Sequence, residues 1–403
     1  MNKKAFASIC FAIFVAMLGM GIISPLLSVY ATSMGATGFQ IGFMASGYSL
    51  SRALVQPFTG SFSDRRGRKN LMVVGLAAYA VLSIGYALAN NIHQLTTVRL
   101  LHGFASALVM PIAQAYVGDI CPKGKEDTYM GLFMMSMYLG MGAGPLLGGS
   151  VSEAFGKMSP AFYIMAILAA CGLVLMVLFV PQTEAHIRNR KGGAPMSVMI
   201  KDNKVRAVAL YLGSRGILRQ GITNFIVLFG TKALHMHLTL ASAVATVYIL
   251  TEAFGQGLVG PITAHFSRKP LMVFGAVTAS GLAFFIAKMG NFFTLLAVLI
   301  PLAIMTSIGR VPALAFNVEL GVKYRRMGAG MGIANGAQDL GHFFGPIAFG
   351  WAMDHFGIGS VFTVGGIICL ASVPLMTYWL YQKDTIYVPE AETATPEPAQ
   401  TQR

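Results

Sequence analysis

Two acidic residues stand inside long apolar stretches of this sequence and are the first candidates for chemistry. Glu252 lies in the middle of the apolar run 240–264, and Asp339 lies in the middle of 327–351. An ionisable side chain in hydrocarbon is costly, so it marks a functional site by default. Because burial disfavours the charged form of a carboxyl group, such a group can bind and release protons. Either acid is therefore a candidate proton carrier.

Arginines outnumber acids within the apolar runs. Arg215 and Arg219 are spaced i and i+4, which places them on one face of a helix. The five arginines are Arg52, Arg99, Arg215, Arg219 and Arg310. Because guanidinium binds carboxylate and phosphate bidentately, the surplus predicts a cavity for a ligand with an anionic group. Snorkelling to the membrane surface is the alternative for Arg310 and Arg215.

Several amides in the second half of the chain could hydrogen-bond the same ligand. They are Gln220, Asn224, Gln256, Asn335 and Gln338. The 25 methionines and 27 phenylalanines supply adaptable apolar walls, although most of them are expected to contact lipid or other helices.

The composition is that of an integral membrane protein. Of 403 residues, 55% are hydrophobic and 11% are charged, and mean hydropathy is +0.65, whereas soluble chains carry about 25% charged residues. Twelve apolar runs have about the 20 residues that a helix needs to cross a bilayer. They lie near 5–30, 41–62, 71–89, 95–118, 129–151, 161–180, 206–230, 240–264, 271–287, 292–316, 327–351 and 361–380.

Polar connections divide the chain. We expect an N-terminal six-helix bundle at 1–180, a cytoplasmic linker at 181–205, a C-terminal bundle at 206–382 and a disordered cytoplasmic tail at 383–403. Lysine and arginine concentrate on alternate connections, so both termini are predicted to be cytoplasmic. This topology accounts for the formal charge of +14, and no nucleic-acid partner is needed. Four scattered cysteines predict neither a disulfide framework nor a metal site.

An internal repeat relates the two halves. A shift of 200 positions lays Gly60, Arg68, Lys69, Leu71, Met72, Val73 and Gly75 on identical residues, and a shift of 201 lays Gly140, Gly144 and Pro145 on Gly341, Gly345 and Pro346. Two units of the same orientation predict a binding site between them, near the bilayer midplane.

The connection GSFSDRRGRK at 60–69 is too polar for hydrocarbon and must join two spanning helices. It resembles the signature loop of the major facilitator superfamily, G-x-x-x-D-R-x-G-R-K/R. The resemblance implies an all-α integral membrane fold of twelve transmembrane helices in two six-helix pseudo-symmetric bundles. It also implies a cytoplasmic gate that involves Gly60, Asp64, Arg65, Gly67 and Arg68. The second copy has Ala264 where the first has Asp64.

Two further motifs extend the resemblance. Run 129–151 contains G-x-x-x-G-P-x-x-G-G, similar to a motif of drug:proton antiporters, and its partial copy keeps the first glycines and the proline but has Phe349. A packing groove is the alternative, since small residues let helices approach and proline kinks them. The residues are Gly140, Gly144, Pro145, Gly148, Gly149, Gly345 and Pro346.

Arg99 stands in L-x-x-x-R-x-x-x-G, which resembles a motif whose arginine is implicated in proton transfer, although His102 replaces the usual glutamine. Asp119 is implied to pair with Arg68 and help lock the gate, or to form a fixed ion pair. In this fold the helices of Arg52 and Asp339 face each other, so these two could form a permanent salt bridge instead of carrying protons.

We expect a secondary active transporter that exports small amphiphilic molecules or drugs by proton antiport, as in multidrug resistance. The alternatives are export of one organic anion, such as a siderophore or metabolite, and proton-coupled uptake. The sequence lacks the G-x-x-x-x-G-K-[ST], H-E-x-x-H and G-x-S-x-G motifs, so neither an enzyme nor an ATP-driven pump is expected. No cofactor, metal or catalytic residue is expected.

The expected partners are the lipid bilayer, protons and a small-molecule substrate. The protein is expected to be a multi-pass monomer in the bacterial inner membrane.

Overall fold

The computed structural model describes residues 3–66, 68–120, 126–182, 196–263, 265–324 and 327–382, and the regular structure within these ranges is α-helical. The first bundle contains α1 Lys3–Ser33, α2 Gly38–Arg66, α3 Arg68–Leu88, α4 Ile92–Ile120, α5 Glu126–Phe155 and α6 Ser159–Phe179. After the short α7 Met196–Met199 come α8 Asn203–Lys232, α9 Leu238–Thr263, α10 Arg268–Ile286, α11 Phe292–Lys323, α12 Met327–Phe356 and α13 Ser360–Tyr381.

Apart from α7, each helix coincides with one of the apolar runs expected from the sequence. The helix α8 begins at Asn203, upstream of the expected 206, because the side chain of Asp202 caps it and accepts a hydrogen bond from Lys204 N at 2.7 Å. This cap satisfies a backbone donor that the first turn would otherwise leave unpaired.

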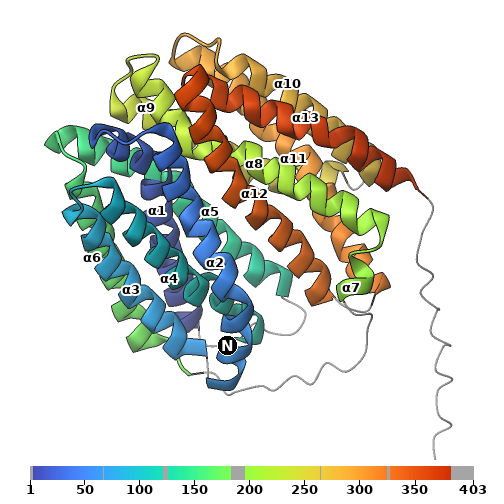
Figure 1. The fold of residues 1–403 in the computed structure, drawn as a ribbon. Helices are drawn as coiled ribbons and strands as arrows, with labels where there is room; N and C mark the ends of the chain where they lie inside the picture. Colours follow the sequence, from blue (N-terminus) through green and yellow to red (C-terminus); the bar gives the residue numbers. More distant parts are fainter. Residues whose placement is uncertain are drawn as a thin grey trace, which may run out of the picture.

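The helices form two bundles that lie side by side (Figure 1). In the first, α1 packs on α5 and α6, and α3 packs on α4 and α6; in the second, α8 packs on α12 and α13, and α10 packs on α11 and α13. The bundles meet where α2 contacts α12, α5 contacts α9, and α1 contacts α8. A site between the bundles is therefore built mainly from these six helices.

Among the described residues, nine helices are long and apolar enough to cross a membrane by length and composition, and α2, α8 and α12 are not among them. These three carry Arg52, Arg215, Arg219 and Asp339. Their polar side chains lower their hydropathy, and contact with other helices removes those side chains from hydrocarbon. Of these three helices, α12 contacts both α2 and α8 inside the molecule.

One end of the molecule, where α1 ends and α2 begins, is closed by two matching contacts between the bundles. Asp354 on α12 accepts hydrogen bonds from Gly38 N at 2.6 Å and Phe39 N at 2.8 Å, at the start of α2. Glu153 on α5 accepts one from Thr239 N at 2.7 Å, at the start of α9. Each carboxylate faces the positive end of a helix dipole. We call these the end caps.

The glycines of α5 let it approach α1 closely. A Cβ added at Gly140 would lie 2.2 Å from the Phe14 carbonyl oxygen, and one at Gly144 would lie 2.5 Å from that of Leu18. Gly149, farther along α5, faces Ser242 of α9 instead. The glycine motif therefore contributes both to helix packing within the first bundle and to the contact of that bundle with the second.

We expect Gly144→Ala to destabilise the protein by about 1–3 kcal/mol, because the methyl group meets backbone atoms that cannot move independently. Thermal unfolding in detergent measures the effect. The control is Gly131→Ala on the same helix, where a Cβ would meet nothing within 4 Å. Equal melting temperatures for the two variants would contradict the close contact between α1 and α5.

Candidate functional site

A cavity of about 260 Å³ lies between the bundles and collects most of the charged residues that the sequence singled out. The first bundle contributes methionines and Tyr48 to its lining, and the second contributes polar groups including Gln220, Asn335 and Gln338. All five arginines line it: Arg52, Arg99, Arg215, Arg219 and Arg310. For Arg215 and Arg310, this position disagrees with snorkelling to the surface.

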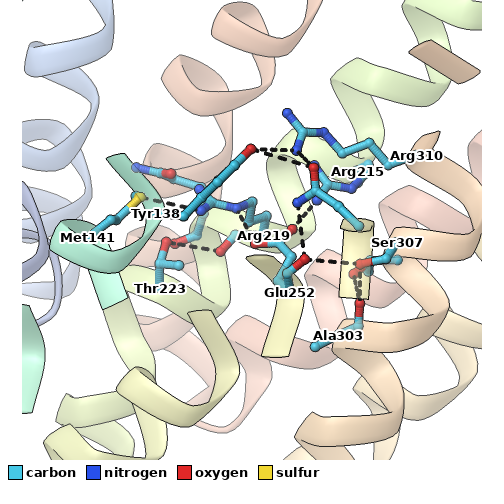
Figure 2. A network of polar contacts seen from close by, with 12 residues as sticks. Tyr138, Met141, Arg215, Arg219, Thr223, Glu252, Ala303, Ser307 and Arg310 are labelled. Carbon is cyan, nitrogen blue, oxygen red and sulfur yellow. Dashed lines mark hydrogen bonds and ion pairs between the residues drawn. The ribbon is translucent and has the colours of Figure 1, made fainter. Parts of the chain in front are cut away.

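Beside the cavity, the second bundle holds an ion-pair cluster around Glu252 (Figure 2). Glu252 on α9 is 2% exposed. Its Oε1 pairs with Arg215 Nη2, and its Oε2 lies 2.8 Å from Arg219 Nε. Because the two arginines are one helical turn apart on α8, both reach the same carboxylate. The predicted ligand-binding arginines and the predicted proton carrier thus form one unit.

Arg310 on α11 bonds only to neutral groups among the described residues. Its Nη1 donates to Gln256 on α9 and, at 3.1 Å, to the hydroxyl of Tyr138 on α5 (Figure 2). Tyr138 belongs to the first bundle, so this contact crosses between bundles. Sequence reasoning missed Tyr138, because no motif or charge distinguishes one tyrosine on an apolar helix from another.

Arg52 and Asp339 form the second ion pair of the cavity. Arg52 Nη2 on α2 pairs with Asp339 Oδ1 on α12, which links the bundles. His342 Nδ1 lies 3.9 Å from the same oxygen. The salt bridge that the sequence offered as an alternative role for Asp339 is therefore present in this conformation.

Arg99 on α4 is 1% exposed and has no acidic partner among the described residues. Its guanidinium carbon lies 4.7 Å from the centre of the Tyr48 ring, which is a cation–π distance. Its Nε and Nη1 have no hydrogen-bond partner within the described ranges. His102, one turn along, lies edge-on to Tyr79 with ring centres 4.5 Å apart.

The charges of the cavity do not balance. Counting histidine as neutral, the described residues in and beside it include five arginines and the two carboxylates of Glu252 and Asp339. Three positive charges remain unbalanced. In a site enclosed by apolar helices such charges attract an anion strongly.

Two predicted ligand-binding residues are not in the cavity lining: Gln256, which accepts a hydrogen bond from Arg310, and Asn224. Asn224 on α8 is 1% exposed, and neither its Oδ1 nor its Nδ2 has a partner among the described residues. The preceding residue, Thr223, does line the cavity, so Asn224 is kept out by the direction in which its side chain leaves α8, toward the side where Phe225 belongs to the apolar core. Asn224 therefore does not line the cavity in this conformation, and its role in ligand binding stays a prediction.

Most of the predicted gate lies outside the part of the chain that the structure describes. Gly67 lies outside the described residues, and so do the surroundings of Gly60 and the side chains of Asp64, Arg65 and Asp119. Arg68 is the first residue of α3. The gate stays a prediction.

Comparison with known proteins identifies the family. Residues 9–232 and 208–402 match the Major Facilitator Superfamily. An uncharacterized MFS-type transporter of Methanocaldococcus jannaschii is 26% identical over 375 residues, which cover 91% of this chain and 95% of that protein. Multidrug resistance protein 2 of Bacillus subtilis is 25% identical over 397 residues, covering 95% and 97%. Quinolone resistance protein NorA of Staphylococcus aureus is 30% identical over 183 residues, covering 45% of this chain and 46% of NorA.

Solved structures share the fold. A bacterial homologue of the human lysosomal transporter Spinster, inward-facing and occupied, matches with a TM-score of 0.78 at 13% identity, covering 93% of this chain and 94% of that one. The human organic anion transporter MFSD10 matches with a TM-score of 0.64 at 18% identity, covering 93% and 99%. The expected all-α fold of two helical bundles is confirmed, and the chain is a multi-pass membrane transporter rather than an enzyme. This chain belongs to the Major Facilitator Superfamily of secondary transporters.

Proposed function

We propose that this chain is a proton-coupled transporter of small amphiphilic molecules that works by alternating access. The Glu252 cluster carries the proposal. The buried carboxylate of Glu252, beside the cavity, forms ion pairs with Arg215 and Arg219. When this carboxylate takes up a proton, its negative charge no longer neutralises the two arginines. Proton binding therefore changes the charge that the cavity presents to a substrate, which links the two binding events.

Efflux of drugs by proton antiport is the mode that the named relatives favour. Multidrug resistance protein 2 and quinolone resistance protein NorA are similar to this chain, and the glycine motif of α5 resembles that of drug:proton antiporters. A cationic substrate would compete with the proton for the carboxylate of Glu252. Competition of this kind moves substrate and proton in opposite directions.

Transport of an organic anion is the mode that the site favours. Three unbalanced positive charges in and beside the cavity attract anions and repel cations. An anion near Glu252 repels its carboxylate, so anion and proton bind more strongly together than apart. The coupling would then move both in the same direction, as in proton-coupled uptake.

The topology belongs to the same proposal. We assign one bundle to residues 1–180, a linker to 181–205, the second bundle to 206–382 and a tail to 383–403. We also assign the protein to the plasma membrane, with both termini in the cytoplasm. The distribution of lysine and arginine supports this orientation.

Transport in proteoliposomes under an imposed pH gradient tests the proposal. Purified protein is assayed with an aromatic carboxylate and with a cationic drug, and movement of each is compared with and without the gradient. Movement of either compound driven by the gradient supports proton coupling, and its direction relative to the protons decides between the two modes. Equal movement with and without the gradient would overturn the coupling.

Alternating access also predicts a role for the end caps. We expect Asp354→Asn combined with Glu153→Gln to open the closed end more often, because each substitution removes a charge from a helix N-terminus. Ser46, which is buried and donates to Phe343 O across the bundle contact at 2.5 Å, reports this opening. In a background without native cysteines, labelling of Ser46→Cys by a maleimide should rise about three- to tenfold. Glu319→Gln, which removes an exposed acid on α11, is the control and should leave labelling unchanged; no rise in the double variant would contradict the role of the caps.

A further inference from the structure

Two of the five cavity arginines, Arg99 and Arg310, form no ion pair within the described part of the chain. Arg52, Arg215 and Arg219 are in ion pairs. Arg310 bonds only to the neutral groups of Tyr138 and Gln256, and its Nε has no partner. Arg99 faces the ring of Tyr48, and two of its three nitrogens lack partners.

A buried guanidinium without a counter-ion is costly, because the protein interior does not replace the water that it loses. Buried polar atoms are bonded in the great majority of cases, so each exception calls for an explanation. Arg99 is 1% exposed, yet it lines the cavity together with Arg310. An anion in this cavity would supply the missing counter-charge to both guanidinium groups.

The two arginines come from different bundles. Arg99 is on α4 and Arg310 is on α11, which are equivalent helices in the internal repeat. A ligand that contacts both therefore links the two bundles through itself. If the bundles move relative to each other, a ligand that contacts both binds one arrangement of the bundles more tightly than another, and its binding shifts the equilibrium between them.

The rest of the lining suits an apolar body. Five methionines of the first bundle line the same cavity: Met17, Met20, Met110, Met137 and Met141. Thioether side chains are flexible and polarisable, and they make favourable contacts with aromatic rings. Methionine walls beside unpaired guanidinium groups fit a molecule that is aromatic at one end and anionic at the other.

We propose that the cavity binds an amphiphilic aromatic anion that contacts Arg99 of one bundle and Arg310 of the other, while Arg215 and Arg219 stay with Glu252. The inference rests on the proposed transport of small amphiphilic molecules and names their class. It also moves the anion site away from Arg215 and Arg219, which the sequence alone had favoured. Arg215 and Arg219 belong to the proton-binding cluster, and Arg99 and Arg310 bind the substrate.

Isothermal titration calorimetry on the full-length protein in nanodiscs tests the inference with three probes of similar shape. They are 2-naphthoate, the neutral 2-naphthamide and the cationic 2-naphthylmethylammonium. We expect 2-naphthoate to bind about tenfold more tightly than either other probe, as a charge-assisted hydrogen bond requires. Equal or tighter binding of the ammonium would overturn the inference.

Variants locate the site. Arg310→Gln should weaken 2-naphthoate binding about tenfold, and Arg310→Lys should retain most of it. Arg99→Lys should retain binding better than Arg99→Gln, with thermal unfolding of each variant confirming that it is folded. The matched control is Arg268→Gln, which removes an arginine that pairs with Glu319 on α11 and lies outside the cavity lining. Equal affinity in Arg310→Gln and Arg268→Gln would overturn the inference.

The anion site and the proton coupling can be refuted independently of each other. Arginine-dependent binding of 2-naphthoate without gradient-driven transport would support the anion site and overturn the coupling. Gradient-driven transport of a cationic drug, with no binding of 2-naphthoate, would support the coupling and overturn the anion site.

Discussion

Glu252→Gln is expected to abolish transport driven by a pH gradient while leaving movement of substrate down its own gradient. Glutamine has nearly the same shape as glutamate but cannot carry a proton at this position. It also leaves Arg215 and Arg219 without an acid. Removing one partner of a buried ion pair costs about 3–5 kcal/mol, so a lower melting temperature is expected as well.

A second substitution separates the two effects. The double variant Glu252→Gln with Arg215→Gln loses one negative and one positive charge, so the net charge of the cluster is unchanged. Its stability should therefore recover in part, while gradient-driven transport stays absent. Glu319→Gln, at an exposed acid on α11, is the control for loss of a carboxylate and should change neither property. If Glu252→Gln alone retained gradient-driven transport, Glu252 would not be the proton carrier, and Asp339 would be the remaining candidate.

Neutralising one member of the Arg52 and Asp339 pair is expected to be more harmful than neutralising both. Arg52→Gln and Asp339→Asn each leave a charge at the contact between α2 and α12 without its partner, whereas the double variant leaves none. Their side chains are 27% and 8% exposed, so water screens the pair only in part. We expect a coupling energy of about 1–3 kcal/mol in a double-mutant cycle of thermal stability.

The same cycle in the transport assay decides the role of Asp339. If the pair is a structural link between the bundles, the double variant should regain gradient-driven transport that each single variant loses. If Asp339 carries protons, the double variant should stay inactive despite its recovered stability. Additive effects of the two substitutions on stability would contradict the ion pair itself.

The sequence predicted the fold in unusual detail, because a bilayer restricts a chain more than water does. Hydrocarbon requires apolar helices of nearly fixed length, so the runs of the sequence correspond to the helices of the structure. The repeat at shifts of 200 and 201 predicted two equivalent bundles. It also relates Glu153 to Asp354, the two carboxylates of the end caps, although neither stood out as a motif residue.

The sequence singled out the charged residues of the candidate site but did not show which of them contact each other. All five intramembrane arginines line the cavity, because charges on membrane helices avoid lipid and gather where the helices enclose a polar space. Asn224 lies outside the cavity lining, since the sequence does not show which side of α8 faces the cavity. Tyr138 was missed, because its role depends on its position opposite Arg310.

By itself, then, the sequence determined that this protein is a helical membrane transporter built from two repeats, with charged residues between them. Only the tertiary structure decided which charges neutralise each other. Arg215 and Arg219 are paired with Glu252, Arg52 is paired with Asp339, and Arg310 is held by neutral groups from two helices. The physical reason is that an ion pair requires contact within a few ångströms, and such contact depends on how each helix is rotated and how deep it lies against helices distant in the chain.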